Sequence, residues 1–232
     1  MWDGYEDKAV APVRRVRCTV YPTGKGKALM KILHLDSSIL GDNSASRALS
    51  AETIAHLKKA HPEAKITYHD LAAHPIPELG SGHVAARFGA EVTDETLQAD
   101  LARGNAHIDE LLAADVIVIG VPMYNFTVPA QLKNWVDRIM VAGKTFRYGE
   151  QGPVGLLPEG KKAILVSTRG GQYSPGHPAA SMDHQEPYLA AVFGFVGLTD
   201  LTWIRAEGLS RGGDARETAT SAARAEIAAL SI

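Results

Sequence analysis

Short runs of aliphatic residues alternate along the chain with longer segments in which apolar residues recur every three or four positions. The clearest run covers residues 115–121, where Val and Ile follow one another without an intervening polar position. Such a run is typical of a strand that is buried on both faces of a parallel sheet. Shorter runs predict four further strands, at residues 32–35, 65–69, 162–167 and 201–206.

Helical periodicity fills most of the segments between these strands. The predicted helices cover residues 45–60, 93–113, 129–141, 188–196 and 214–230. Turn residues within 146–157 predict a hairpin, and the polar, Gly- and Pro-bearing segment 72–90 is expected to be a connection. Regular alternation of strand and helix predicts a flavodoxin-like α/β fold. In this three-layer sandwich, a five-stranded parallel sheet in the order 2-1-3-4-5 has helices on both faces.

Composition limits the class of protein more than it identifies the function. The 232 residues are 45% hydrophobic and 22% charged, which fits one ordinary domain. A net charge of −2 gives no reason to expect nucleic-acid binding, and no apolar run reaches the roughly 18 residues of a membrane helix. Because Cys18 is the only cysteine, no intrachain disulfide can form, and we expect a cytoplasmic protein.

Residues 1–29 differ from the rest in composition. They carry six basic and three acidic residues with little periodicity, which leaves a charge of about −5 on the remainder. No continuous apolar stretch of a secretory signal is present there. We expect residues 1–29 to be a disordered or non-native extension and residues 30–232 to form the domain. A basic arm that binds nucleic acid is the alternative.

Three polar loops follow the first, third and fourth predicted strands. The first, residues 36–47, places Ser44 and Ser46 at the start of a helix, where free N–H groups and the helix dipole favour an anion. This loop lacks a dinucleotide-binding glycine pattern, and its serines suit a terminal phosphate monoester such as that of FMN. A serine-capped helix without a ligand is the alternative.

The second and third loops suit a planar ligand. Residues 122–126 combine an amide with flat apolar groups, and residues 167–173 contain paired glycines that allow close approach of the backbone. Arg169 offers either a charge to a ligand or a partner in a surface salt bridge. Since the carboxyl ends of neighbouring parallel strands share one edge, the three loops are expected to meet in one crevice.

Five segments resemble signatures of the bacterial FMN-dependent NADH:quinone oxidoreductases, also called azoreductases. They are residues 122–126, 129–137, 143–148, 168–171 and 193–197, and the resemblance extends from Met30 to the end of the chain. It implies a flavodoxin-like homodimer with one FMN per subunit near the interface.

The resemblance also implies roles for individual residues. The phosphate and ribityl side of FMN would be held by Ser38, Ser44, Ala45 and Ser46. The isoalloxazine ring would be bordered by Met123, Tyr124, Asn125, Phe126, Thr168, Arg169, Gly170 and Gly171. Phe146 would reach the flavin pocket of the partner subunit. Family members often carry Lys where Asp36 stands and Ser where Thr168 stands, and residues 172–186 differ most between relatives.

The implied activity is a two-stage exchange in which the flavin carries the redox chemistry. NADH or NADPH would reduce the flavin, which would then pass two electrons to a quinone or an aromatic azo compound. A quinone needs one such cycle to become a hydroquinone, whereas cleavage of an azo bond to two amines needs two. No side chain is required as a catalytic nucleophile, acid or base. No metal is expected, because the histidines at 56, 61, 69, 74 and 83 lack metal-ligand spacing and His177 and His184 are more consistent with a polar loop.

Two other classes of protein remain open at this stage. A flavodoxin-type electron carrier would have the same fold without small-molecule turnover, although such carriers are usually more acidic. A flavin-free regulatory module is the second alternative, because fold does not imply function. A serine hydrolase is not favoured, since the chain lacks the nucleophile-elbow pattern.

Overall fold

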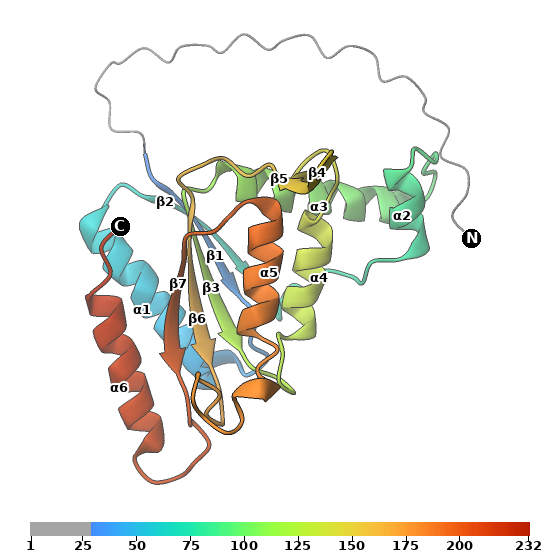
Figure 1. Cartoon of the computed structure of the whole chain (residues 1–232). Coiled ribbons are helices and arrows are strands. Elements are labelled where there is room, and N and C mark those ends of the chain that lie inside the picture. Colours follow the sequence, from blue (N-terminus) through green and yellow to red (C-terminus); the bar gives the residue numbers. More distant parts are fainter. Residues whose placement is uncertain (1–28) are drawn as a thin grey trace.

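A parallel sheet of five strands forms the centre of the molecule, and helices cover both of its faces (Figure 1). The structure is a computed structural model that describes residues 29–232. The proposed extension, residues 1–29, therefore lies outside the described residues except for its last position.

Strands and helices alternate through most of the chain. In order they are β1 (Lys31–Asp36), η1 (Gly41–Asn43), α1 (Ala45–Ala60), β2 (Lys65–Asp70), α2 (Ser81–Arg87), α3 (Glu95–Ala113), β3 (Val116–Pro122), α4 (Ala130–Ile139), β4 (Phe146–Gly149), β5 (Gly152–Gly155), β6 (Lys162–Thr168), η2 (Ala180–Met182), α5 (Glu186–Val196), β7 (Leu201–Ala206) and α6 (Ala215–Ala228).

The predicted parallel sheet of five strands is confirmed. Its order is β2-β1-β3-β6-β7, and every neighbouring pair is parallel. The strand numbers differ from the prediction because β4 and β5 form a separate two-stranded sheet. The order reverses between β1 and β3, so a crevice opens beyond the carboxyl ends of these two strands.

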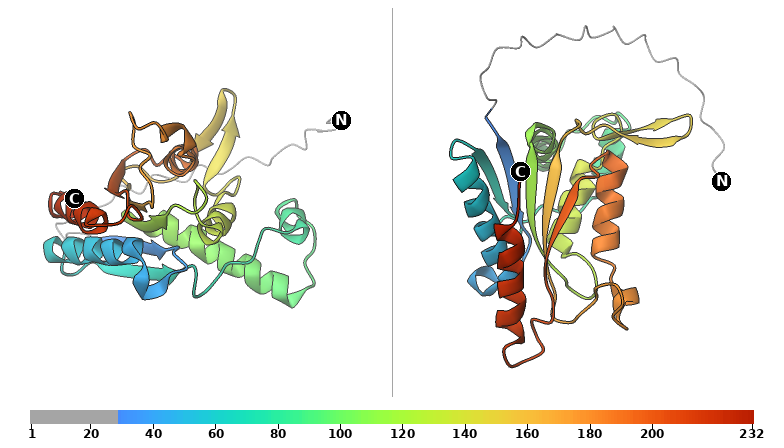
Figure 2. Two further views of the ribbon diagram at one scale, coloured as in Figure 1. Left: turned by 90° about the horizontal axis from the view of Figure 1, so that it is seen from below. Right: turned by 60° about the vertical axis from the view of Figure 1, so that its left-hand side comes forward.

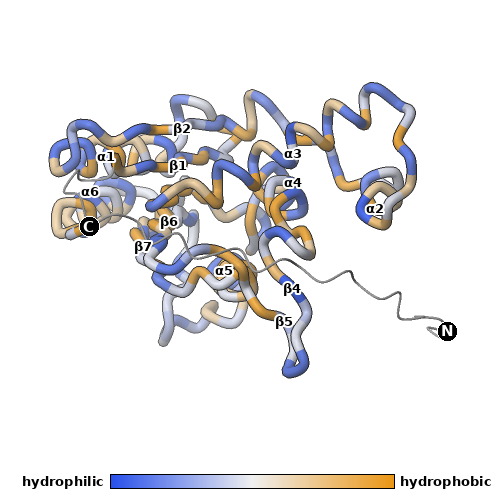
Figure 3. Tube along the Cα trace, turned by 90° about the horizontal axis from the view of Figure 1, so that it is seen from above, coloured by the Kyte–Doolittle hydropathy of each residue, from blue (hydrophilic) through white to orange (hydrophobic). Residues whose placement is uncertain are grey.

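Each face of the sheet has its own apolar core, and the tube in Figure 3 shows the hydrophobic residues concentrated along the strands. On one face α3, α4 and α5 pack against residues such as Leu35, Ile117 and Leu165. Trp135 of α4 is fully buried in this layer. On the other face α1 and α6 enclose a smaller cluster that includes Val118. Both faces of the sheet are thus closed to water, which leaves the carboxyl edge as the open side.

Helix α2 was not predicted, because the segment 72–90 was expected to be a connection. Its formation depends on contacts with α3 that the local sequence does not reveal. The backbone N–H of Gly80 donates to Nδ1 of His83 at 3.0 Å, and Nε2 of the same ring lies 2.7 Å from Asp100. A Cβ at Gly82 would lie 2.7 Å from a terminal methyl group of Leu97, so glycine lets α2 approach α3 without a shift of that side chain.

The predicted hairpin is confirmed as β4 and β5, which project from the body of the molecule (Figure 2). Phe146 at its base is 8% exposed, and its ring packs edge-on against Phe195 with centroids 4.7 Å apart. The exposed aromatic residue of the hairpin is Tyr148, at 74%. Within one subunit, Phe146 therefore anchors the hairpin, and Tyr148 is the aromatic residue free to contact another molecule.

No helix among residues 29–232 is both long and apolar enough to cross a bilayer.

Candidate functional site

The loop after β1 is connected to the loop after β3 through Tyr124. The hydroxyl of Tyr124 lies 3.1 Å from the hydroxyl of Ser38 and accepts a hydrogen bond from the backbone N–H of Ile39 at 3.2 Å. Ser37 adds a second connection, since its hydroxyl donates to the carbonyl of Gly120 at 2.8 Å. Two of the three loops are therefore fixed to each other before any ligand binds.

Serine hydroxyls gather at the start of α1. Ser44 caps this helix, because its hydroxyl accepts a hydrogen bond from the backbone N–H of Arg47 at 3.3 Å. The hydroxyls of Ser44 and Ser46 lie 3.0 Å apart, and both residues are buried, while Ala45 between them is half-buried. The first N–H groups of a helix have no partner within the helix, so this end offers donors to an anion.

Arg47 organises this loop, a role that sequence reasoning missed. Its guanidinium donates to the carbonyl of Ser38 at 2.7 Å and to both carboxylate oxygens of Asp70 at 2.6 Å. The hydrogen bonds from Arg47 lower the pKa of Asp70 to about 2. The only signal in the sequence was that both residues occur at the carboxyl edge, one at the start of a helix and the other at the end of a strand.

Asp36 turns away from the loop and into the protein. Its buried carboxylate accepts hydrogen bonds from Ser50 at 2.8 Å and from Tyr68 at 3.1 Å. A Cβ at Gly120 would collide with this carboxylate, so glycine at that position makes room for Asp36. The carboxylate of Asp36, the last residue of β1 at the edge of the proposed phosphate loop, is therefore hydrogen-bonded within the protein and is not directed into that loop. His34 is buried beside Ser50, and Nε2 of its ring lies 3.1 Å from the Ser50 hydroxyl.

The loop after β3 contains a strained turn. Tyr124 and Thr127 pair through backbone hydrogen bonds of 3.0 and 3.1 Å, and the two residues between them have positive φ angles. These angles are 47° for Asn125 and 73° for Phe126, a conformation that is uncommon for residues other than glycine. Such strain costs on the order of 1–3 kcal/mol per residue and clusters at functional sites. Asn125 and Phe126 are exposed, so the turn presents both residues outward.

The loop after β6 lies beside this turn, and the Arg169 guanidinium is buried behind it. Arg169 is 2% exposed and pairs with Asp183 at 3.0 Å, with Glu207 at 2.9 Å and with Glu186. The surface salt bridge considered from the sequence is therefore a buried ion cluster instead, and a contact of Arg169 with the cofactor stays a prediction. Burial alone would raise the pKa of Glu207, but hydrogen bonds and the charge of Arg169 outweigh burial, and the pKa lies below its ordinary value.

Packing within the chain accounts for the paired glycines. A Cβ at Gly170 would lie 2.8 Å from the hydroxyl of Ser210, and one at Gly171 would lie 2.8 Å from the hydroxyl of Tyr173. The loop is attached to its neighbour by the backbone N–H of Met123, which donates to the carbonyl of Thr168 at 2.8 Å.

A cavity of about 520 Å³ opens beside the strained turn. This volume lies within the range of about 300–1,000 Å³ that small-molecule sites occupy. The wall is formed by the loop after β1, the turn, the start of α4 and one tyrosine of α5: Ile39, Tyr124, Asn125, Thr127, Val128, Pro129, Ala130, Gln131, Lys133 and Tyr188. Residues 168–171 are not part of this wall, although they support the turn from behind. Burial, together with the charge of Asp137, raises the pKa of Tyr188 to about 12, so its hydroxyl keeps its proton at neutral pH.

Comparison with known proteins gives close relatives over nearly the whole described chain. Residues 30–230 match a protein family described by its flavodoxin-like fold. An FMN-dependent NADH:quinone oxidoreductase of Rhizobium meliloti is 52% identical over 199 residues, which cover 86% of this chain and 96% of the relative. One from Ralstonia nicotianae is 55% identical over 201 residues, 85% of this chain and 95% of the relative.

Solved structures agree with the sequence relatives. An azoreductase from Bacillus anthracis has a TM-score of 0.78 at 32% identity, covering 86% of this chain and 97% of the other. An FMN-dependent NADH-azoreductase from the same species, solved in complex with FMN, has a TM-score of 0.79 at 25% identity over 86% and 96% of the two chains. With relatives more than half identical along most of its length and a matching fold, this chain belongs to the family of FMN-dependent NADH:quinone oxidoreductases, or azoreductases.

Proposed function

We propose that this protein is an FMN-dependent oxidoreductase that uses NADH to reduce quinones to hydroquinones and aromatic azo compounds to amines. The observation that carries the proposal is the joining of the serine-rich start of α1 to the strained turn 124–127, through Tyr124, beside an open cavity. The family and the names of its members support the same activity.

The residues present fit an FMN molecule. Buried hydroxyls and free N–H groups at the start of α1 suit a phosphate, and the Asp36 carboxylate, which would repel it, is turned away toward Ser50. The cavity beside the turn is the right size for a planar ring, and its apolar wall suits stacking. We therefore assign Ser38, Ser44, Ala45 and Ser46 to the phosphate and ribityl side of FMN.

We assign the ring of FMN to the turn and to the loop behind it. Met123, Tyr124, Asn125 and Phe126 border the ring, while Thr168, Gly170 and Gly171 supply backbone behind the turn. The Arg169 side chain supports this loop indirectly, because its guanidinium forms ion pairs with three carboxylates.

Bound FMN supplies the redox chemistry, by taking up a hydride from NADH and passing two electrons to the substrate. The chain binds and orients the reactants. Its turn is held rigid by backbone pairing, and the phenol of Tyr188 stays protonated at the cavity wall, where it can donate a hydrogen bond to a substrate oxygen. No described side chain of the cavity needs to act as a nucleophile.

An anaerobic absorption spectrum tests the proposal. The protein is mixed with FMN, then with NADH, and finally with menadione. We expect NADH to bleach the oxidised flavin band and menadione to restore it, with steady turnover when both are in excess. Repeating the experiment with NADPH measures the preference for the donor.

Each alternative predicts a different spectrum. Binding of FMN without bleaching by either nucleotide would support an electron carrier. Failure to bind FMN would support a flavin-free module and would refute the assignment of the site.

A homodimer with FMN near its interface, a cytoplasmic location and a domain that begins at residue 30 remain predictions. The exposed hairpin residue Tyr148 is a natural contact for a second subunit. Light scattering of the wild type and of a Tyr148→Ser variant tests the first prediction, with a dimer expected for the wild type and a weaker dimer for the variant.

A further inference from the structure

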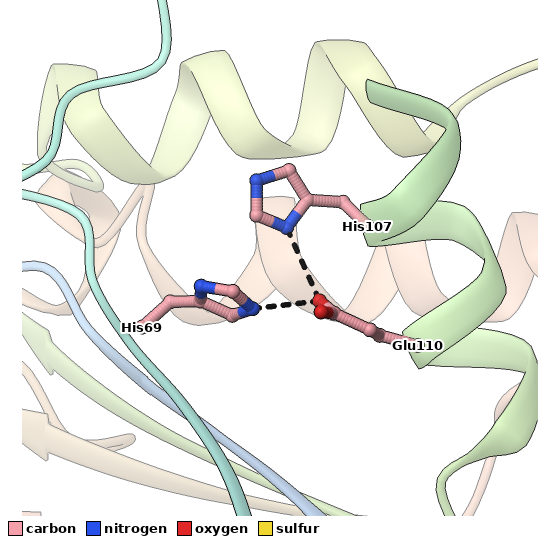
Figure 4. A group of neighbouring side chains, drawn as sticks. All are labelled: His69, His107 and Glu110. Atoms are coloured by element: carbon pink, nitrogen blue, oxygen red, sulfur yellow. Dashed lines mark hydrogen bonds and ion pairs between the residues drawn. The ribbon is translucent and has the colours of Figure 1, made fainter. Parts of the chain in front are cut away.

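Two histidines and a glutamate meet between the edge strand β2 and helix α3, away from the cavity (Figure 4). His69 comes from β2, whereas His107 and Glu110 lie one turn apart on α3. Both imidazole rings face the carboxylate of Glu110, and their three candidate ligand atoms lie within 4.8 Å of one another. The sequence gave no metal-ligand spacing for His69, because its two partners follow 38 and 41 residues later.

The separations approach those of a tetrahedral metal site. With bonds of about 2.1 Å, the ligand atoms of a tetrahedral zinc ion lie about 3.4 Å apart. Nδ1 of His107 is 3.4 Å from Oε2 of Glu110, which already matches. Nε2 of His69 is 2.6 Å from the same oxygen and would move outward by less than 1 Å. The Glu110 side chain is 29% exposed, so its carboxylate has room to rotate outward. The two imidazole nitrogens lie within 4.8 Å of each other and would close toward 3.4 Å when both bind one ion.

His107 is unsatisfied in the absence of another partner. The residue is 5% exposed, and its Nδ1 has no hydrogen-bond partner among the described residues although it points toward Glu110. A buried polar atom without a hydrogen-bond partner is unfavourable, and a bond to a metal ion would satisfy it.

The surrounding charges do not prevent binding of a cation. Arg103 lies one turn before His107 on α3, but its guanidinium is paired with Asp100 at 2.6 Å. Beyond Glu110, a cavity of about 280 Å³ is lined by residues that include Thr67, Asp109 and Lys65. This opening gives the site access to solvent and room for a water molecule as fourth ligand.

We propose that His69, His107 and Glu110 form a Zn²⁺ site that fastens the edge strand β2 to helix α3. Two imidazoles, one carboxylate and a water molecule are a ligand set that zinc accepts. The site lies on the opposite side of β2 from the Asp70 carboxylate that binds Arg47 and shares no residue with the wall of the flavin cavity. Its role is therefore structural and independent of the proposed redox activity.

Zinc titration of the untagged holoprotein tests the proposal. The experiment uses the full chain in a Cys18→Ser background, so that the one cysteine cannot bind the metal. After treatment with a chelator, calorimetry should show one saturable Zn²⁺ per chain. His69→Ala, His107→Ala and the conservative Glu110→Gln should each weaken binding about 100-fold or more, since even outer-shell partners contribute 10–100-fold. Exposed His74, as His74→Ala, is the matched control and should bind as the parent does.

Hydrogen exchange adds a readout other than affinity. Zinc should slow the exchange of amides in β2 and in the second half of α3, with no change in the hairpin β4–β5. At free zinc 100 times the parent's dissociation constant, the ratio of unfolded to folded protein should fall about 100-fold in the parent and by about twofold or less in Glu110→Gln. Far-UV circular dichroism and flavin content establish that each variant is folded. The proposal is wrong if the parent binds no stoichiometric zinc, or if each of the three single variants binds zinc as tightly as the parent does.

Discussion

Replacing Arg169 by Met tests how much stability depends on the buried ion cluster. The substitution removes a buried cation of similar length and leaves Asp183, Glu186 and Glu207 close together. Loss of one member of a buried pair costs about 3–5 kcal/mol. Each carboxylate keeps another partner, because Asp183 caps the start of α5, Glu186 binds Arg205 and Glu207 binds backbone and hydroxyl donors. We therefore expect the free energy of unfolding to fall by about 3 kcal/mol, near the lower end of this range.

Chemical unfolding measures this loss, and thermal unfolding should show a fall in Tm of roughly 6–12 °C for a chain of this size. Arg169→Lys keeps the charge but not the planar fork, so its loss should be smaller than that of Arg169→Met.

The effect should also depend on pH. In the wild type the pKa of Glu207 is lowered, so its contribution to stability is present above the unfolded pKa and is lost as pH falls. In Arg169→Met, crowded carboxylates raise one another's pKa, and the folded variant gains protons on acidification. The difference in unfolding free energy should therefore shrink as pH falls through about 4.5. A difference below about 0.5 kcal/mol at pH 7, or one that grows in acid, would refute the reasoning.

Three further substitutions address the loops of the site. Tyr124→Phe removes the hydroxyl that joins two loops and should weaken FMN binding by about 1 kcal/mol. The FMN dissociation constant should then rise about fivefold while the protein stays folded. An unchanged dissociation constant in a fluorescence titration would contradict this. Gly120→Ala places a Cβ against the carboxylate of Asp36 and should destabilise the protein by about 1–3 kcal/mol in urea unfolding, whereas a neutral effect would mean that the carboxylate moves aside freely. Asp70 has its pKa lowered to about 2 by Arg47, so Asp70→Asn should cost about 2 kcal/mol at pH 7. That deficit should disappear between about pH 4 and pH 2, where the wild type loses the same stabilisation, and a deficit that persists at pH 2 would contradict the assignment.

Sequence patterns predicted the sheet and most of the helices because these elements depend on local periodicity. The bounds of α1 and β7 match the prediction, and α3 begins within two residues of it. Helix α2 was missed because its formation depends on Asp100 and Leu97 of another helix. No window of local sequence contains that information.

The position of the candidate site could be predicted from the sequence more readily than the contacts of its side chains. Three loops at the carboxyl edge follow from strand order alone, and Tyr124 does join two of them. The direction of the Arg169 side chain could not be predicted, because two of its three partners lie in the segment 172–186 and the third follows β7. For the same reason, His69 gave no sign of its partners on α3.

The joining of the loops after β1 and β3 has a consequence for how the protein folds. Ser37 and Gly120, like Ser38 and Tyr124, are more than 80 positions apart in the sequence. Contacts of such separation form only after the chain between them is organised, so the proposed flavin site is completed late in folding. Loss of bound flavin on heating should then coincide with loss of the whole sheet in one cooperative transition, and a nascent chain cannot hold the cofactor until β3 has been synthesised.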